Sequence, residues 1–190
     1  MQAARGTSVE AEIGTTAPPR RARLWGLFAT VAIVLYAGDV VTKIIAVERL
    51  SGRADVPVIG DFLQLHLTRN PGAAFSTGTQ FTVALSCVAV VAVVVVLWLS
   101  RRIGSVAWAC ALGALFAGIA GNLTDRILRD PGPFRGHVID FLMLPNWPVF
   151  NMADICINIG AGLVLVQAFR GVKIDGSRER NDEALSEPDE

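Results

Sequence analysis

Four long apolar segments constrain the fold of this chain more than any other feature of its sequence. They lie at about residues 24–47, 81–99, 103–123 and 149–169. A helix needs about 20 apolar residues to cross the hydrocarbon core of a bilayer. The first segment is longer than the roughly 7–15 apolar residues of a secretory signal peptide, so we expect a helix that is retained. The sequence therefore predicts an all-α membrane protein with four transmembrane helices.

The distribution of charge separates a membrane domain from two polar tails. Only 18% of the residues are charged, against about 25% in an average soluble domain. We expect residues 24–170 to form the membrane domain, with a polar cytoplasmic tail at 1–23. Residues 171–190 are charged and poor in apolar side chains, which predicts a disordered cytoplasmic tail. The formal net charge is zero, and we expect no nucleic-acid partner.

The cysteines and histidines give no sign of a metal site. Cys87, Cys110 and Cys156 all fall within apolar runs. An odd number without paired spacing argues against a disulfide framework or a zinc site, so we interpret them as small buried hydrophobic side chains. His66 and His137 have no partners at the spacing of metal ligands. We expect neither a metal nor another cofactor.

Short basic flanks predict the orientation of the helices. Arginines precede the first apolar segment, fill the tight turn at 101–102 and follow the fourth segment near residue 170. An excess of Lys and Arg in short flanks marks the cytoplasmic side of a membrane protein. We therefore expect both termini in the cytoplasm, and the longer connections at about 48–80 and 124–148 on the outer side.

Two local patterns refine this architecture. Residues 63–68 alternate between apolar and polar side chains, which is the period of a half-buried strand, and the turn residues Asn70-Pro71-Gly72 follow. This predicts a small extracytoplasmic β element between the first and second helices. In the third helix, small residues recur at four-residue spacing between 109 and 121, which lets helices approach closely in lipid. We expect that helix to lie at the centre of the bundle.

Ionisable residues within transmembrane segments are costly and mark function by default. Asp39 and Lys43 are four residues apart and can pair, and a structural salt bridge explains them as well as catalysis does. Other polar residues gather where the third helix ends and the fourth begins. They are Asn122, Asp125 and Arg126 on one helix face, Asn151, Asp154 and Asn158 on another, and Asp140 in an apolar stretch between the helices.

Four aspartates thus converge on the outer face from separate segments, and this convergence predicts a functional site. Two carboxylates in one site do not both ionise readily, so one can act as a general base towards water while the other donates a proton. This is the chemistry of aspartic proteases. Spacing alone leaves the pair open among Asp125, Asp140 and Asp154. The adjacent Arg126 favours an ion pair for Asp125, whereas Asp140 and Asp154 have no neighbouring charge and suit a shared proton.

Two other functions use the same residues. A proton-coupled transporter or channel subunit would employ buried carboxylates, but the repeated halves and broken helices typical of transporters are not evident in the sequence. A structural membrane protein with incidental ion pairs would leave the stripe of Asn151, Asp154 and Asn158 unexplained. Ser76 has no obvious base and lies outside any Gly-x-Ser-x-Gly elbow, so we interpret it as a turn residue.

Five short motifs stand in order along the chain. They are Asp39-x-x-Thr42-Lys43, Asn70-Pro71-Gly72-Ala73-Ala74-Phe75-Ser76, Gly121-Asn122-x-x-Asp125-Arg126, Val138-Ile139-Asp140-Phe141 and Phe150-Asn151-x-Ala153-Asp154. Together, over about residues 36–165, they resemble the bacterial lipoprotein signal peptidases, also called signal peptidase II. The chain departs from that family in a longer connection at 129–135 and a correspondingly short one at 141–150.

The resemblance implies an integral-membrane aspartic endopeptidase of the bacterial cytoplasmic membrane, with Asp140 and Asp154 as its catalytic residues. Its substrates would be diacylglyceryl-modified prolipoproteins, cut just before the lipidated Cys by a water-mediated reaction at the outer leaflet. Membrane lipid would be the other partner, and we expect a monomer. Substrate-binding or supporting roles would fall on Asp39, Lys43, Asn70, Gly72, Asn122, Asp125, Arg126, Asn151, Ala153 and Asn158.

Overall fold

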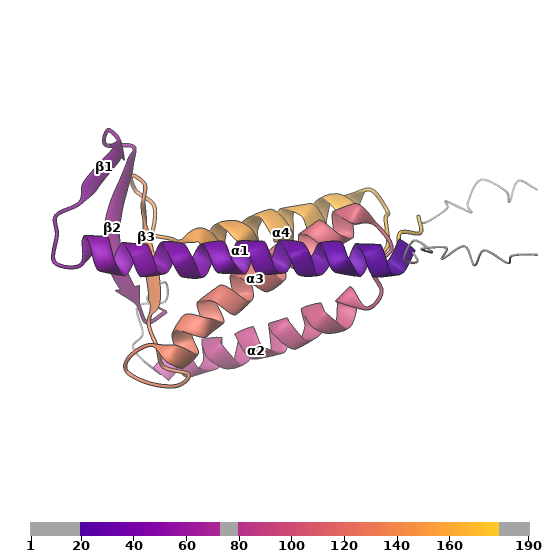
Figure 1. Ribbon diagram of the computed structural model, residues 1–190, viewed down its shortest axis with the longest axis horizontal. Coiled ribbons are helices and arrows are strands. Elements are labelled where there is room, and N and C mark those ends of the chain that lie inside the picture. The colour runs from indigo at the N-terminus through magenta and orange to yellow at the C-terminus, as the bar shows by residue number, and fades with distance from the viewer. Residues whose placement is uncertain (1–19, 73–79, 179–190) are drawn as a thin grey trace, which may run out of the picture.

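The computed structural model describes residues 20–72 and 80–178. In these residues four helices run along one another, and a small sheet lies at one end of the bundle (Figure 1). The elements are α1 (Arg20–Leu50), β1 (Val56–Ile59), β2 (Leu63–Asn70), α2 (Gln80–Ser100), α3 (Val106–Leu128), β3 (Val138–Met143) and α4 (Met152–Phe169). All four helices are long and apolar enough to cross a membrane, which confirms the predicted fold class.

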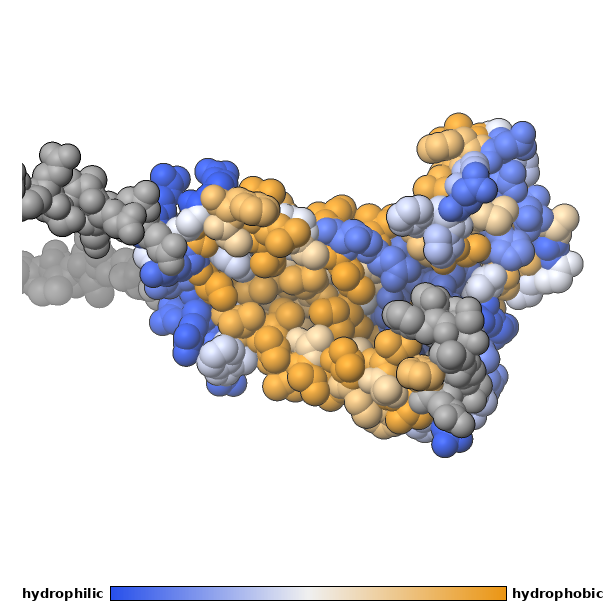
Figure 2. All heavy atoms as spheres, turned by 180° about the vertical axis from the view of Figure 1, so that it is seen from behind, coloured by the Kyte–Doolittle hydropathy of each residue, from blue (hydrophilic) through white to orange (hydrophobic). Residues whose placement is uncertain are grey.

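The surface is that expected of a protein embedded in lipid. Figure 2 shows a broad apolar belt over the helices, with hydrophilic residues at both ends of the molecule. Large apolar side chains that a soluble protein would bury are exposed along the helices, among them Ile33, Val91 and Leu165. The two ends of the described chain lie at the end of the bundle opposite the sheet (Figure 1).

The helices differ from the predicted apolar segments chiefly at their ends, where polar capping residues set the boundaries. The hydroxyl of Ser105 accepts a hydrogen bond from the backbone N–H of Trp108, so α3 begins at Val106 and not near residue 103. Asn151 caps α4 in the same way, so that helix begins at Met152. At its other end α3 continues to Leu128, well beyond residue 123, because its polar last turns are packed against neighbouring segments.

Helix α3 lies at the centre of the bundle, as the stripe of small residues predicted. It packs against α1, α2 and α4, and 61% of its apolar span is buried, against 17–22% for the other three helices. The approach to α4 is close enough to need glycine. A Cβ atom at Gly118 would lie 2.3 Å from the carbonyl oxygen of Ala153.

The sheet is antiparallel with strand order β1-β2-β3. The predicted β element is present as β1 and β2, but the third strand comes from the connection between α3 and α4, which the sequence analysis left without structure. Strand β3 is almost wholly buried, so it shows no alternation of apolar and polar residues by which periodicity could have found it. The register places Asn70 opposite Val138 and Thr68 opposite Asp140.

Part of the predicted disordered tail is ordered. The indole N–H of Trp108 donates to the carbonyl of Val172 (3.1 Å), and the backbone N–H of Gly104 donates to the carbonyl of Ile174 (2.9 Å). These contacts tie the chain after α4 to the first turn of α3 and to the connection that precedes it. The rest of the two tails, and the motif residues Ala73, Ala74, Phe75 and Ser76, lie outside the described residues.

Two glycines of α4 give a matched test of the packing. A Cβ atom at Gly160 would lie 2.8 Å from the backbone nitrogen of Leu115 in α3, whereas one at Gly162 would meet nothing within 4 Å. We expect Gly160→Ala to lower the free energy of unfolding by about 1–3 kcal/mol because the helices must separate. Gly162→Ala should raise it by up to about 1 kcal/mol, since alanine favours the helix.

Unfolding of the purified protein in detergent measures both effects. Equal stability of the two variants would contradict the close packing of α4 on α3.

Candidate active site

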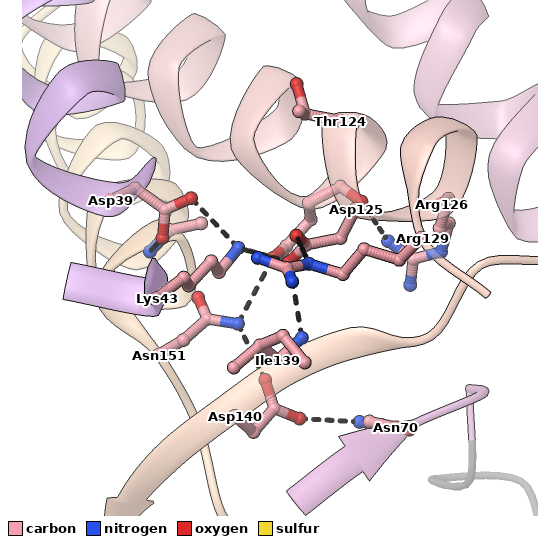
Figure 3. Close-up of polar contacts among 12 residues, drawn as sticks. Asp39, Lys43, Asn70, Thr124, Asp125, Arg126, Arg129, Ile139, Asp140 and Asn151 are labelled. Atoms are coloured by element: carbon pink, nitrogen blue, oxygen red, sulfur yellow. Dashed lines mark hydrogen bonds and ion pairs between the residues drawn. The ribbon is translucent and has the colours of Figure 1, made fainter. Parts of the chain in front are cut away.

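A cluster of polar side chains lies where α1, α3 and the start of α4 meet the sheet (Figure 3). Most of its members are shielded from solvent, which is costly for polar groups unless they satisfy one another. Asp39, Lys43 and Asn151 are at most 1% exposed, and Asp125 and Asp140 at most 3%. The convergence predicted from sequence is therefore observed for the residues of α1, α3, β3 and α4.

Lys43 is the hub of this cluster. Its ammonium nitrogen lies 2.9 Å from Asp39 Oδ2 and 2.9 Å from Asp125 Oδ2, and it donates to Asn122 Oδ1 at 3.0 Å. The ammonium thus makes two ion pairs and one hydrogen bond, and both carboxylates that pair with it are buried. The predicted pairing of Asp39 with Lys43 is present, but as one part of a larger network and not as an isolated salt bridge.

Asp125 is bound by groups other than its chain neighbour. Its carboxylate pairs with Lys43 and with Arg129, one helical turn further along α3, and Oδ2 also accepts from the backbone N–H of Ile139 in β3. The ion pair with Arg126 suggested by the sequence is not among the salt bridges of the described residues. Adjacent helical residues point in different directions, and a guanidinium N–H of Arg126 donates to the carbonyl of Asn122. The i,i+4 spacing of Arg129 could have indicated the true partner.

The lysine also fixes the orientation of an amide. Because an ammonium can only donate, Asn122 must turn its oxygen towards Lys43. Its Nδ2 then faces Asp154 and donates to Oδ1 at 2.8 Å. The charge on α1 thus determines that α3 presents a hydrogen-bond donor to Asp154.

Asn151 links the two aspartates that the sequence favoured. Its side-chain oxygen accepts from the backbone N–H of Asp154 (3.0 Å), and Asp154 Oδ2 accepts from the backbone N–H of Asn151 (3.1 Å), which together form a capping box at the start of α4. Nδ2 of the same asparagine donates to Asp140 Oδ1 at 2.6 Å. The residue that starts the helix therefore also holds Asp140 beside Asp154.

Asp140 lies on β3, and its second oxygen faces β2. Asn70 Nδ2 donates to Asp140 Oδ2 at 2.9 Å, as the antiparallel register allows. Burial, reinforced by the charge of Asp154, raises the pKa of Asp140 to about 6, although the amides of Asn70 and Asn151 and the charge of Lys43 act in the opposite direction. This carboxyl keeps its proton to a higher pH than an exposed aspartate does.

Both aspartates open onto one cavity of about 470 Å³. Asn70 and Asn158 contribute further polar groups to its wall, and Trp147, Ile155 and Ile159 contribute apolar ones. Asn158 is exposed, and its Nδ2 donates to the backbone carbonyl of Asp154. The wall of this cavity therefore combines two carboxylates with apolar side chains.

The remaining predicted residues support the cluster from behind. The backbone N–H of Ala153, which is fully buried, donates to Asp39 Oδ1 at 2.9 Å. Gly72 has a φ of +105°, and its N–H donates to Asn70 Oδ1, closing the turn after β2. Sequence reasoning missed Arg129 and the backbone N–H of Ile139, neither of which belongs to the polar stripes.

The fold and the site together define a multi-pass membrane protein with paired carboxylates at one end of its helical bundle. Residues 31–170 match the family model described as signal peptidase (SPase) II, so the chain belongs to the signal peptidase II family of peptidases.

Individual relatives agree with this assignment. The chain is 44% identical over 181 residues to the lipoprotein signal peptidase of Mycobacterium avium, covering 92% of this chain and 98% of that protein. It is 45% identical over 159 residues to the lipoprotein signal peptidase of Leifsonia xyli, covering 83% and 74%. A solved bacterial membrane enzyme has a similar structure, with a TM-score of 0.68 and 25% identity over 76% of this chain and 94% of that one.

The raised pKa of Asp140 predicts a stability that depends on pH. An aspartate in the unfolded chain titrates near pH 4, so between about pH 4 and pH 6 the folded state holds this proton more tightly. Wild-type stability should therefore fall as the pH rises through that range. Over this rise in pH, the free energy of unfolding of the wild type should fall by up to about 3 kcal/mol more than that of Asp140→Asn, which has no carboxyl to titrate at this position.

Unfolding in detergent at about pH 4.5 and about pH 7.5 tests this. The exposed-residue control Asp61→Asn should follow the wild-type curve. Parallel curves for the wild type and Asp140→Asn would contradict the raised pKa.

Proposed function

We propose that this protein removes signal peptides from diacylglyceryl-modified prolipoproteins, cutting just before the lipidated cysteine, with Asp140 and Asp154 as its catalytic residues. The observation that carries the proposal is that these two carboxylates alone among the four clustered aspartates line the described cavity. Asp39 and Asp125 are instead occupied by Lys43 behind it. Family membership supports a prolipoprotein substrate.

The balance of charge supports a proton shared by the pair. Four carboxylates meet three cations in the cluster. Lys43 and Arg129 pair with Asp39 and Asp125, and the guanidinium of Arg126 interacts electrostatically with Asp140 and Asp154. One negative charge of the pair is thus compensated, and a proton neutralises the other, as in sites where two carboxylates cannot both ionise.

In the proposed reaction Asp154 is the ionised member. It accepts hydrogen bonds at both oxygens and lies in the first turn of α4, where the helix dipole favours negative charge. Asp154 takes a proton from a water molecule, whose oxygen attacks the carbonyl carbon of the scissile peptide. Asp140 gives its proton to the carbonyl oxygen. The tetrahedral diol then collapses: Asp154 gives the proton it took from water to the departing amine, Asp140 takes a proton from a diol hydroxyl, and the C–N bond breaks to leave a carboxylic acid.

The surroundings of the cavity support a lipid-anchored substrate. Trp147, Ile155 and Ile159 form an apolar rim beside the carboxylates. In this proposal the acyl chains of the substrate lie in the bilayer, alongside the apolar belt of the helices (Figure 2). Confinement of this kind brings the scissile bond to the carboxylates without loss of further orientational freedom. We propose that a monomer acts in this way.

The charges at the opposite end support the orientation. Arg20, Arg21, Arg101 and Arg102 all lie at the end of the bundle away from the sheet, at the start of α1 and in the turn between α2 and α3. Under the positive-inside rule that end is cytoplasmic. Both termini would then be cytoplasmic, and the active site would lie at the outer leaflet.

Cleavage of a synthetic prolipoprotein with a diacylglyceryl cysteine, followed by a gel-mobility shift, tests the proposal. Asp140→Asn and Asp154→Asn should each lower the cleavage rate at least about 100-fold, because general acid–base catalysis is lost. The control Asp61→Asn removes an exposed carboxylate from the turn between β1 and β2 and should cleave at the wild-type rate. Cleavage by Asp140→Asn or Asp154→Asn near the wild-type rate would overturn the proposal, and so would equal cleavage of a precursor that lacks the lipid.

A further inference from the structure

One face of α2, at the end nearest the sheet, carries buried hydroxyl groups that the active-site network does not include. Thr82 and Ser86 are at most 1% exposed and are separated by one helical turn, with Leu85 beside them. Most of the remaining surface of α2 faces lipid, since only 17% of its apolar span is buried. Buried hydroxyls need acceptors, and outside α2 these two hydroxyls contact the turn after Asn70 and the segment before Asp140.

The first contact holds the turn that follows β2. The hydroxyl of Thr82 donates to the carbonyl of Pro71, the residue directly after Asn70. Gly72 packs beside it, since a Cβ atom there would lie 2.8 Å from Leu85 Cδ1. This turn has little freedom, because Asn70 Oδ1 also accepts the N–H of Gly72. Helix α2 thus fixes the backbone on which the Asn70 amide is carried.

The second contact holds the segment that leads into β3. The hydroxyl of Ser86 lies 2.9 Å from the carbonyl oxygen of Phe134 and 2.8 Å from that of Thr82, so its proton can serve either acceptor. Phe134 has a φ of +64°, a conformation that is uncommon and costly for a bulky side chain. An external tie at this residue keeps the loop in that conformation before the chain turns into Val138 and Asp140.

We propose that Thr82 and Ser86 are positioning residues that set the contact between Asn70 and Asp140. The amide and the carboxyl come from paired strands, at the end of β2 and near the start of β3, and α2 holds the segment next to each of them. The consequence for catalysis rests on the proposed function. The effect on the contact and titration of Asp140 is independent of the proposed function.

The other charged groups that act on Asp140 lie on helices other than α2. They therefore help to identify how a change at Thr82 could reach Asp140. They are Asp154 on α4, Lys43 on α1 and Arg126 on α3. None of these residues has a hydrogen bond to α2 among the contacts of the described chain. A change in Asp140 caused by Thr82 should therefore pass through Asn70. A donor to the ionised carboxyl lowers its pKa, so a loosened Asn70 should raise it.

Infrared titration of ¹³C-aspartate-labelled protein in detergent measures this directly, with the Asp140 signal identified by its loss in Asp140→Asn. We expect Thr82→Val to move the Asp140 midpoint up by about 0.5–1 pH unit and Thr82→Ser to restore it. Ser100→Ala is the matched control. It removes an equally buried hydroxyl from the other end of α2, where Ser100 donates to the carbonyl of Leu97, and should leave the midpoint unchanged.

A double mutant tests the route. Asn70→Ala should raise the midpoint by itself, and Thr82→Val should add nothing in that background. A midpoint in Thr82→Val equal to that in Ser100→Ala, or a full further shift in the double mutant, would overturn the inference. If Thr82→Val does not fold, Ser86→Ala replaces it, with the same expected direction and the same overturning result.

Cleavage assays separate this inference from the proposed function. In an active peptidase the limb of the kcat/KM profile that belongs to Asp140 should move to higher pH in Thr82→Val, whether Asp140 serves as acid or as base. If the wild type cleaves no prolipoprotein but the infrared midpoint shifts, the proposed function fails and the positioning role stands. Cleavage by the wild type with an unmoved midpoint and limb in Thr82→Val would reject the positioning role alone.

Discussion

The buried ammonium of Lys43 is the interaction on which the rest of the site depends. A charge removed from water in this way is costly unless it is paired, and Lys43 pairs with two carboxylates and hydrogen-bonds one amide oxygen, on two helices. By pairing with Asp39 and Asp125, it leaves Asp140 and Asp154 as the two aspartates of the cluster that line the described cavity. By turning the amide of Asn122, it directs a donor to Asp154. One cation thus separates the two carboxylates that are ion-paired behind the cavity from the two that line it, which we propose as the catalytic pair.

Close helix packing makes this arrangement possible. The acceptors of Lys43 lie on α1 and α3, and Asn151 at the start of α4 contacts the amide of Asn122 in the same network. Side chains as short as Asp and Asn reach across three helices only when the backbones are near one another. The small residues of α3 permit this approach, as Gly118 shows against Ala153. The polar cluster therefore depends on the stripe of small residues, which allows the helices to pack closely enough for short side chains to meet.

Sequence patterns predicted the features that depend on local spacing. Hydropathy identified the membrane spans, and i,i+4 spacing identified the pair of Asp39 with Lys43. Features created by tertiary structure were missed. Strand β3 is buried on both faces and shows no alternation, so its pairing with β2, which joins Asn70 to Asp140, had no local signal. The contacts of Thr82 were equally hidden, because a hydroxyl in an apolar helix gives no indication of its acceptor.

The central claim is that the cluster binds one exchangeable proton, and that this proton belongs to the pair of Asp140 and Asp154. Infrared spectra of the ¹³C-aspartate-labelled wild type, recorded from about pH 5 to about pH 8 in detergent, count the buried protonated carboxyls. The account predicts one such carboxyl, which releases its proton near pH 6, is absent from Asp140→Asn and titrates at a lower pH in Asp154→Asn, where the charge that reinforces burial is removed. A protonated carboxyl that survives unchanged in both variants would place the proton on Asp39 or Asp125 and contradict the account.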